Sequence, residues 1–323
     1  MFRFVDKALL KMVGIVAAMA VIAAGCGGSS GGGDAGGGKL DDYDLSDAEI
    51  AVGSKDFTEQ QILGQITVKA LEAAGASVND QVGLAGTNAA REALLNGEID
   101  TYWEYTGTGW ITHLGNTDPI ADSKKQYEAV KKADLKENDI ELLEPAPFNN
   151  TYALAVREEA YKDLGVEKLS DMGKLIKERP EEATVCIESE FNTRDDGLPG
   201  LEKTYGYKFE KGNKSLVDTG VAYTQTDKGK CNFGEVFTTD GRIKALGLKL
   251  IKDDKKFFPI YNPSFNVRKD VLKDNPDLKP LATDIAKALD TKTMQDLNAS
   301  VDVDGESYDA AADKFLEDNG FIK

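Results

Sequence analysis

Few side chains in this sequence are of the kinds that catalysis or metal binding usually requires. His113 is the only histidine, and none of the three cysteines forms a Cys-x-x-Cys pair. A Ser-His-Asp or Cys-His mechanism would therefore depend on His113 alone, and a structural zinc site would lack ligands. The chain also has no P-loop for nucleotide phosphates. We expect no catalysis, no cofactor and no metal, with His113 at the surface or at a helix end. An exported enzyme that uses His113 is the alternative.

The N-terminus has the features of an export signal. Arg3, Lys7 and Lys11 make it positive, and residues 12–25 form an apolar stretch that is short for a membrane-spanning helix. The stretch ends in Ala23-Ala24-Gly25-Cys26, which resembles the bacterial lipobox, although position 23 usually carries a larger aliphatic residue. The resemblance implies a signal peptide, residues 1–25, and diacylation of Cys26. An ordinary secretory signal is the alternative.

A glycine-rich segment follows Cys26. Residues 27–38 contain eight glycines and two serines among twelve residues. Such a composition cannot bury apolar surface and behaves as a flexible tether. We therefore expect residues 26–44 to be a lipid-anchored linker that holds a folded, monomeric protein on the extracytoplasmic face of the cell membrane. No other part of the chain is expected to enter the membrane.

Two cysteines remain once Cys26 is assigned to the lipid. Cys186 and Cys231 are an even pair in an exported chain, and exported proteins fold in compartments that allow disulfides. We expect a disulfide between them, and two buried free thiols are the alternative.

The charge and length of the mature chain limit its partners and its architecture. Residues 1–25 carry three basic side chains and one acidic one, so their removal takes the net charge from −17 to −19. Such acidity argues against nucleic acid, because the phosphates would be repelled. The remaining residues 45–323 are enough for two domains.

Strands and helices are predicted to alternate along the folded part. The predicted strands lie near residues 49–52, 78–84, 99–105, 142–147, 152–156, 183–187 and 233–238. A capping box at residues 58–61 begins a helix with apolar residues at helical spacing, and Gly75 ends it. Further helices are predicted at residues 277–289, 292–299 and 310–318. This alternation predicts an α/β fold with largely parallel sheets.

Six segments in a fixed order resemble one known family. They are Gly53-Ser54-Lys55-Asp56-Phe57-Thr58-Glu59-Gln60, Tyr102-Trp103-Glu104-Tyr105-Thr106-Gly107-Thr108, Phe148-Asn149-Asn150-Thr151-Tyr152, Arg194-Asp195-Asp196-Gly197-Leu198-Pro199-Gly200-Leu201, Phe237-Thr238-Thr239-Asp240-Gly241 and Phe257-Phe258-Pro259-Ile260-Tyr261. Together they are similar to the glycine betaine, choline and carnitine (quaternary ammonium) binding lipoproteins of osmoprotectant ABC transporters. The similarity runs from about residue 49 to the C-terminus.

The resemblance implies a two-lobed clamshell fold of the type II periplasmic-binding-protein class, with two hinge crossovers. Residues 45–149 and 260–323 would form lobe I, and residues 150–259 would form lobe II. A small ligand would bind in the cleft between the lobes, which close by hinge motion. The partner would be an ABC permease in the membrane.

The resemblance also assigns residues to the ammonium end of the ligand. A trimethylammonium group has no N–H to donate, so aromatic faces bind it through cation–π attraction. Tyr105, Tyr152 and Tyr261 would supply three walls of this aromatic cage. Phe237 would supply the fourth, where related proteins often carry tyrosine. Backbone oxygens around Asn150 would add negative potential.

At the other end, Lys55 and Arg194 would meet a carboxylate, and the Thr108 hydroxyl would donate a further hydrogen bond. Two cations facing the neutral hydroxyl of choline would lack compensation in a closed cleft. The expected ligand is therefore glycine betaine or a related carboxylated compound rather than choline.

Each assignment has an ordinary structural alternative. The tyrosines and Phe237 could be core or hinge residues, Arg194 could form a surface ion pair with its neighbouring aspartates, and Thr108 could cap a short helix. We expect Trp103 to be structural or at the rim and Tyr102 to be uninvolved. Leu198 replaces a bulky aromatic of related proteins. The alternative functions are binding of choline, carnitine, an amino acid or a polyamine, and a structural or adhesive role.

Overall fold

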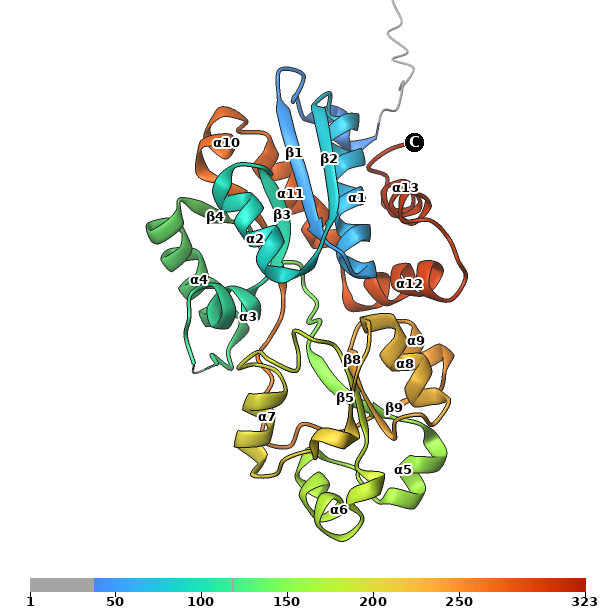
Figure 1. Ribbon diagram of the computed structural model, residues 1–323. Coiled ribbons are helices and arrows are strands. Elements are labelled where there is room, and N and C mark those ends of the chain that lie inside the picture. Colours follow the sequence, from blue (N-terminus) through green and yellow to red (C-terminus); the bar gives the residue numbers. More distant parts are fainter. Residues whose placement is uncertain (1–37, 118) are drawn as a thin grey trace, which may run out of the picture. The chain divides into compact units, whose positions relative to one another are not determined.

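The computed structural model describes residues 38–117 and 119–323. The predicted signal peptide, Cys26 and most of the predicted linker lie outside these residues. Two five-stranded sheets organise the described part, with strand orders β2-β1-β3-β10-β4 and β7-β6-β8-β5-β9 (Figure 1). We call each sheet, with the helices that pack on it, a lobe; the first lobe contains β1 and the second contains β5.

The first lobe combines the beginning and the end of the folded chain. Its strands are β1 (Glu49–Lys55), β2 (Ser77–Leu84), β3 (Thr101–Tyr105), β4 (Ile140–Leu142) and β10 (Pro263–Arg268). Its helices are α1 (Thr58–Ala73), α2 (Gly86–Asn96), α3 (Thr106–Thr108), α4 (Ser123–Asn138), α10 (Lys269–Asp274), α11 (Leu278–Ala288), α12 (Thr291–Asp302) and α13 (Tyr308–Asp318). Helix α1 packs against α12 and α13, so the first and the last parts of the described chain meet in one lobe (Figure 1).

The second lobe is built from the middle of the chain. Its strands are β5 (Tyr152–Val156), β6 (Val185–Ile187), β7 (Lys214–Leu216), β8 (Phe233–Phe237) and β9 (Lys249–Leu250). Its helices are α5 (Glu158–Leu164), α6 (Met172–Glu178), α7 (Leu198–Tyr205), α8 (Thr219–Asp227) and α9 (Arg242–Ala245). Within the described ranges of both lobes, every helix is too short or too polar to span a bilayer.

Helix α1 follows the apolar spacing of its sequence. Ile62, Leu63 and Ile66 are fully buried in the core of the first lobe, as helical periodicity requires of one face. The predicted capping box is wrong. Thr58 is the first helical residue rather than the N-cap, and its hydroxyl donates to Asp302 of α12 at 2.7 Å. The residue before it, Phe57, is the N-cap and makes no side-chain cap.

Strand direction differs from the prediction of largely parallel sheets. In the first sheet β10 is antiparallel to β3 and β4, and in the second β5 is antiparallel to β8 and β9. Both β5 and β10 are the strands that enter a sheet directly after the chain has come from the other lobe. The strands that follow a helical connection within a lobe, such as β2 after β1, are parallel.

The chain passes between the sheets twice. Residues 143–151 connect β4 to β5, and residues 251–262 connect β9 to β10. The predicted lobe limits at residues 149–150 and 259–260 fall within these connections, and the limits themselves stay a prediction.

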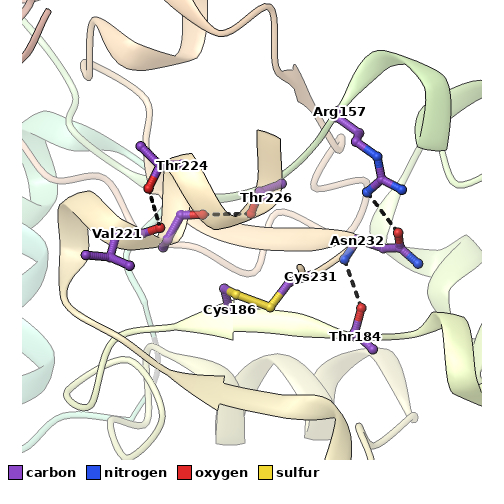
Figure 2. The surroundings of a disulfide bond; sticks show 9 residues. Arg157, Thr184, Cys186, Val221, Thr224, Thr226, Cys231 and Asn232 are labelled. Carbon is purple, nitrogen blue, oxygen red and sulfur yellow. Dashed lines mark hydrogen bonds between the residues drawn. A yellow bond between two sulfur atoms is a disulfide. The ribbon is translucent and has the colours of Figure 1, made fainter. Parts of the chain in front are cut away.

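A disulfide joins two parts of the second lobe. Cys186 in β6 is bonded to Cys231, which lies between α8 and β8, with a Cα–Cα distance of 5.7 Å (Figure 2). Both residues are buried beside Ala222 of α8. The next residue, Asn232, accepts a hydrogen bond from Arg157 at 2.9 Å. The pairing is the one that the even cysteine count favoured.

Candidate functional site

A cavity of about 600 Å³ is lined by residues of both lobes and of both connections between them. Eight residues predicted from the sequence to bind ligand all contribute to its wall. They are Lys55, Tyr105, Thr108, Asn150, Tyr152, Arg194, Phe237 and Tyr261. Strand ends supply several of them, because the loops that follow strands meet at the edge of each sheet.

The four predicted aromatic residues come from four separate parts of the chain. Tyr105 ends β3, Tyr152 begins β5, Phe237 ends β8 and Tyr261 lies in the second connection. Tyr152 and Phe237 are cross-strand partners, with ring centroids 5.2 Å apart. The Tyr261 ring meets Tyr152 at 5.5 Å and nearly at a right angle. Antiparallel pairing of β5 with β8 therefore brings together rings 85 positions apart.

Phe57 is an aromatic wall residue that the sequence analysis missed. Its ring stacks on Phe237 at 5.3 Å and on Tyr105 at 6.2 Å, between the centroids, and it lines the cavity. It connects the ring of the first lobe to the rings of the second. Phe57 lies within one of the six quoted segments. Its sequence neighbours, Asp56 and Thr58, did not indicate that its side chain would line a cavity.

Hydrogen bonds fix the orientation of two tyrosines that line the cavity. The Tyr105 hydroxyl donates to Oε1 of Glu59, and the Tyr261 hydroxyl donates to Oδ2 of Asp196, both at 2.7 Å. Burial raises the pKa of Tyr105, Tyr152 and Tyr261 well above the usual tyrosine range. The three phenol groups therefore stay protonated and uncharged at physiological pH.

Lys55 is half of a buried ion pair. Its Nζ lies 2.7 Å from Oε1 of Glu104, and both side chains are almost fully buried. Burial alone would raise the pKa of Glu104, but the Lys55 ammonium and His113 hold it well below its usual range. The charge of Lys55 is therefore compensated inside the protein. This corrects the expectation of an uncompensated cation at this position, since the compensating Glu104 is brought there only by folding.

Arg194 is paired on one edge and loosely held on the other. Its Nε and Nη2 donate to the two oxygens of Asp196 at 2.7 and 2.6 Å, and the pair is buried rather than at the surface. Its Nη1 lies 3.5 Å from the Thr87 hydroxyl and from Oε2 of Glu190, and its Nη2 lies 3.4 Å from the Thr108 hydroxyl. Hydrogen bonds of that length are weak. These donors can therefore turn to a ligand oxygen at little cost.

Thr108 and Asn150 take part in contacts of the cavity wall. Thr108 makes no side-chain cap, which removes the alternative of a helix-capping role. The Asn150 side chain donates to Glu59 at 2.8 Å, and its backbone N–H donates to Tyr261 O at 3.0 Å. Its Oδ1 is buried and accepts no hydrogen bond from any residue that the structure describes.

The lone histidine and the neighbouring aromatics lie outside the cavity wall. His113 ends the short helix Gly109–His113, as predicted, but its side chain is buried rather than exposed, with Nε2 2.8 Å from Oε2 of Glu104. Burial lowers its pKa. Trp103 is a core residue that donates to the Thr67 hydroxyl at 2.9 Å. Tyr102 donates to Glu104, and Leu198 is buried at the start of α7.

The sequence matches one described family over most of its length. Residues 48–318 match the substrate-binding domain of the ABC-type glycine betaine transport system. A glycine-betaine-binding protein of Pseudomonas aeruginosa is 37% identical over 284 residues, which are 86% of this chain and 90% of the relative. The glycine betaine-binding protein YehZ of Escherichia coli is 34% identical over 282 residues, covering 85% and 92% of the two chains.

Solved structures of similar proteins have the same fold. Apo YehZ from Escherichia coli superposes with a TM-score of 0.63 at 33% identity, over 85% of this chain and 99% of that one. A glycine betaine/carnitine/choline ABC transporter structure superposes with a TM-score of 0.68 at 27% identity, over 85% and 100%. The two mixed sheets therefore form the type II periplasmic-binding-protein fold. On its sequence and its fold, the chain belongs to the family of substrate-binding domains of ABC-type glycine betaine transport systems.

Proposed function

We propose that this protein captures a quaternary ammonium compound, glycine betaine or a close relative, and presents it to an ABC permease. The observation that carries the proposal is the convergence of Tyr105, Tyr152, Phe237 and Tyr261 on one cavity. A trimethylammonium group is large, weakly hydrated and unable to donate a hydrogen bond. Each aromatic face that contacts it contributes on the order of 0.5–2 kcal/mol, with the larger values in a desolvated site. Phe57 adds a further face beside Phe237.

The anionic end of the ligand would meet Arg194 and Thr108. The Nη1 and Nη2 groups of Arg194 make only long contacts on the edge that faces away from Asp196. A carboxylate that accepts from this edge and from the Thr108 hydroxyl would gain charge-assisted hydrogen bonds. Lys55 would act through the buried pair with Glu104 and not as a free charge.

Choline is a second candidate ligand because the basic side chains of the wall are already compensated. Lys55 is paired with Glu104, Arg194 with Asp196, and Arg242 with Asp302 at 3.1 Å. A neutral choline hydroxyl next to these side chains would therefore not leave a basic side chain without a counterion. This removes the main argument against choline as the ligand. Preference for a carboxylate depends on the loosely held donors of Arg194, which the Thr108 hydroxyl supplements.

Members of the family are substrate-binding proteins, which are not a class of enzymes, and they act outside the cytoplasm together with a permease. We further propose that this chain has no turnover, works as a monomer, and is anchored by lipid on Cys26 through the linker of residues 26–44. The sequence of residues 23–38 supports the anchor. Mass spectrometry of the membrane-extracted protein tests it, because a diacylated Cys26 at the mature N-terminus has a distinct mass.

Isothermal titration against a ligand panel tests the binding function. The purified protein is first unfolded and refolded to remove any ligand carried through purification. Glycine betaine, proline betaine, carnitine and choline should release or absorb heat at saturable sites, whereas proline and spermidine should not. Saturable heat only with proline or spermidine would overturn the proposal. No saturable heat with any member would favour a structural role.

A further inference from the structure

Glu59 is a carboxylate buried in the cavity wall without a cationic partner. Its residue is 2% exposed, and it lines the cavity beside the aromatic cage. Within residues 38–117 and 119–323, no lysine, arginine or histidine nitrogen lies within ion-pair distance of it. This distinguishes it from Glu104 and Asp196, which are buried and paired. The charge of Glu59 is thus left without a counterion.

Four donor groups surround the two oxygens of Glu59. Oε1 accepts from the Tyr105 hydroxyl at 2.7 Å and from Asn150 Nδ2 at 2.8 Å. Oε2 accepts from the Thr239 hydroxyl at 2.5 Å and from Asn298 Nδ2 at 3.1 Å. A carboxylate that accepts four hydrogen bonds is satisfied in its ionised form. Hydrogen bonds from neutral groups orient the charge but do not cancel it.

The surroundings add negative potential rather than remove it. Oδ1 of Asn150 and Oδ1 of Asn298 are both buried, and neither accepts a hydrogen bond from a described residue. Both amides therefore turn their donor nitrogens to Glu59 and leave their acceptor oxygens unpaired. Burial also raises the pKa of Glu59, against the four hydrogen bonds that lower it. Keeping this buried carboxylate ionised costs free energy unless a cation lies close to it.

The aromatic cage places a ligand cation next to this anion. The Tyr105 ring is a proposed wall of the cage, and its hydroxyl is the group bonded to Glu59. An anion at the hydroxyl polarises the phenol and increases the negative potential of its ring. Thr239, which belongs to the second lobe, bonds the same carboxylate. Contact between the two lobes therefore encloses Glu59 at the cage.

We propose that Glu59 is a specificity-determining residue that gives the cage a net negative charge, so that the site selects a ligand with a cationic head group over one of the same shape whose head group is uncharged. The inference rests on the proposed function. It assigns to Glu59 the recognition of the positive charge of the trimethylammonium group, as distinct from recognition of its size. Removal of the Glu59 charge should cost the ligand with the cationic head group much more affinity than its isostere with an uncharged head group.

Two ligands that differ in one atom test the proposal. Glycine betaine and 3,3-dimethylbutanoate have the same shape and the same carboxylate, but the second has carbon in place of the ammonium nitrogen. Isothermal titration of both ligands gives a preference ratio for each protein variant. Glu59→Gln keeps the size of the side chain and an oxygen that can accept from Tyr105, and it should lower the preference for glycine betaine by at least about tenfold. Glu72→Gln makes the same change on an exposed position of α1 and should leave the ratio within twofold.

The outcomes separate this proposal from the binding function. If Glu59 only holds Tyr105 and Thr239 in place, both ligands should lose affinity equally, and an unchanged ratio in Glu59→Gln overturns the inference while the binding function stands. If the wild-type protein binds neither of these two compounds nor choline, the result contradicts both this inference and the proposed binding function.

If Glu59→Gln does not fold, a second variant tests whether the Glu59 charge sets the ligand preference. Thr239→Val removes one donor that favours the ionised carboxylate. It should lower the preference ratio at least threefold, and an unchanged ratio overturns the inference.

Discussion

Among the four rings of the proposed cage, Tyr152 makes the most contacts with other aromatic rings of the described residues. Its centroid lies 5.2 Å from that of Phe237 and 5.5 Å from that of Tyr261, and it also contacts Phe191 and Phe258. Such packing fixes the ring before a ligand arrives, so little side-chain entropy is lost on binding. The aromatic faces are therefore held in place by neighbouring side chains rather than by the ligand.

Removal of the Tyr152 ring should weaken glycine betaine binding. We expect Tyr152→Ala to raise the Kd at least tenfold, or about 1.4 kcal/mol, because one cation–π contact and its packing are lost. Tyr152→Phe keeps the ring and should stay within about threefold of the wild type. Isothermal titration measures both variants. An unchanged Kd in Tyr152→Ala would remove this residue from the cage.

Arg194 should distinguish ligands by their anionic end. We expect Arg194→Ala to weaken glycine betaine at least tenfold more than choline, because only glycine betaine has a carboxylate to accept from the guanidinium. Arg194→Ala also leaves the buried Asp196 without its cationic partner in both titrations. Titration of the two ligands gives the answer, and equal losses would show that Arg194 does not reach the ligand.

At the scale of elements, the sequence predicted the positions of the site-bearing strands well. The segments predicted at residues 99–105, 152–156 and 233–238 correspond to β3, β5 and β8. Their relative directions were not predictable, because direction depends on where the chain enters each sheet after crossing from the other. The short strands β7 and β9 were not predicted, because two or three residues carry little pattern, although β6 is equally short and was predicted at residues 183–187.

The lack of long-range information in a local sequence pattern also explains which site residues could be predicted. Residues in the quoted segments could be assigned by resemblance, and eight of them line the cavity. Phe57 and Glu59 stood in one of those segments but were overlooked, since Glu59 was assigned to a helix cap. Its partner Thr239 is 180 positions away. Likewise, the pairing of Lys55 with Glu104 spans 49 positions and has no local signature.

The disulfide should stabilise the second lobe without affecting the ligand. It closes a loop of 45 positions, for which the chain-entropy relation gives about 4 kcal/mol. We expect the double variant Cys186→Ser, Cys231→Ser to lose stability of this order in urea unfolding. Its affinity should be unchanged, because neither cysteine lines the cavity. A loss of stability below about 1 kcal/mol would contradict the structural role.

Strand β8 contains a buried carboxyl that should make stability depend on pH. Burial raises the pKa of Glu235 from 4.5 to about 8. Because the folded-state pKa exceeds the unfolded one, the contribution of this group is fully present below pH 4.5 and is lost as the pH rises through about 8. The slope reaches at most about 1.4 kcal/mol per pH unit.

Glu235→Gln, which cannot ionise, should therefore become more stable relative to the wild type as the pH rises. Urea unfolding at several pH values between 5 and 9 measures the difference. Equal pH dependence of the two proteins would show that Glu235 ionises in the folded state as easily as in the unfolded one.

At the scale of the molecule, hydrogen bonds and ion pairs connect the two lobes. Glu190 of the second lobe accepts from the Thr87 backbone N–H at 2.7 Å, and Arg242 lies 3.1 Å from Asp302 of α12. Polar contacts of this kind can break and form again as the lobes open and close. Ligand binding would add the cation–π contacts to them and so favour the closed arrangement.

The most direct test of the aromatic cage is a crystal structure of the protein with glycine betaine. We expect the ammonium nitrogen within about 6 Å of the ring centroids of Tyr105, Tyr152, Phe237 and Tyr261, with the carboxylate on Arg194. A ligand bound elsewhere, or bound in the cavity with its ammonium turned away from these rings, would contradict it.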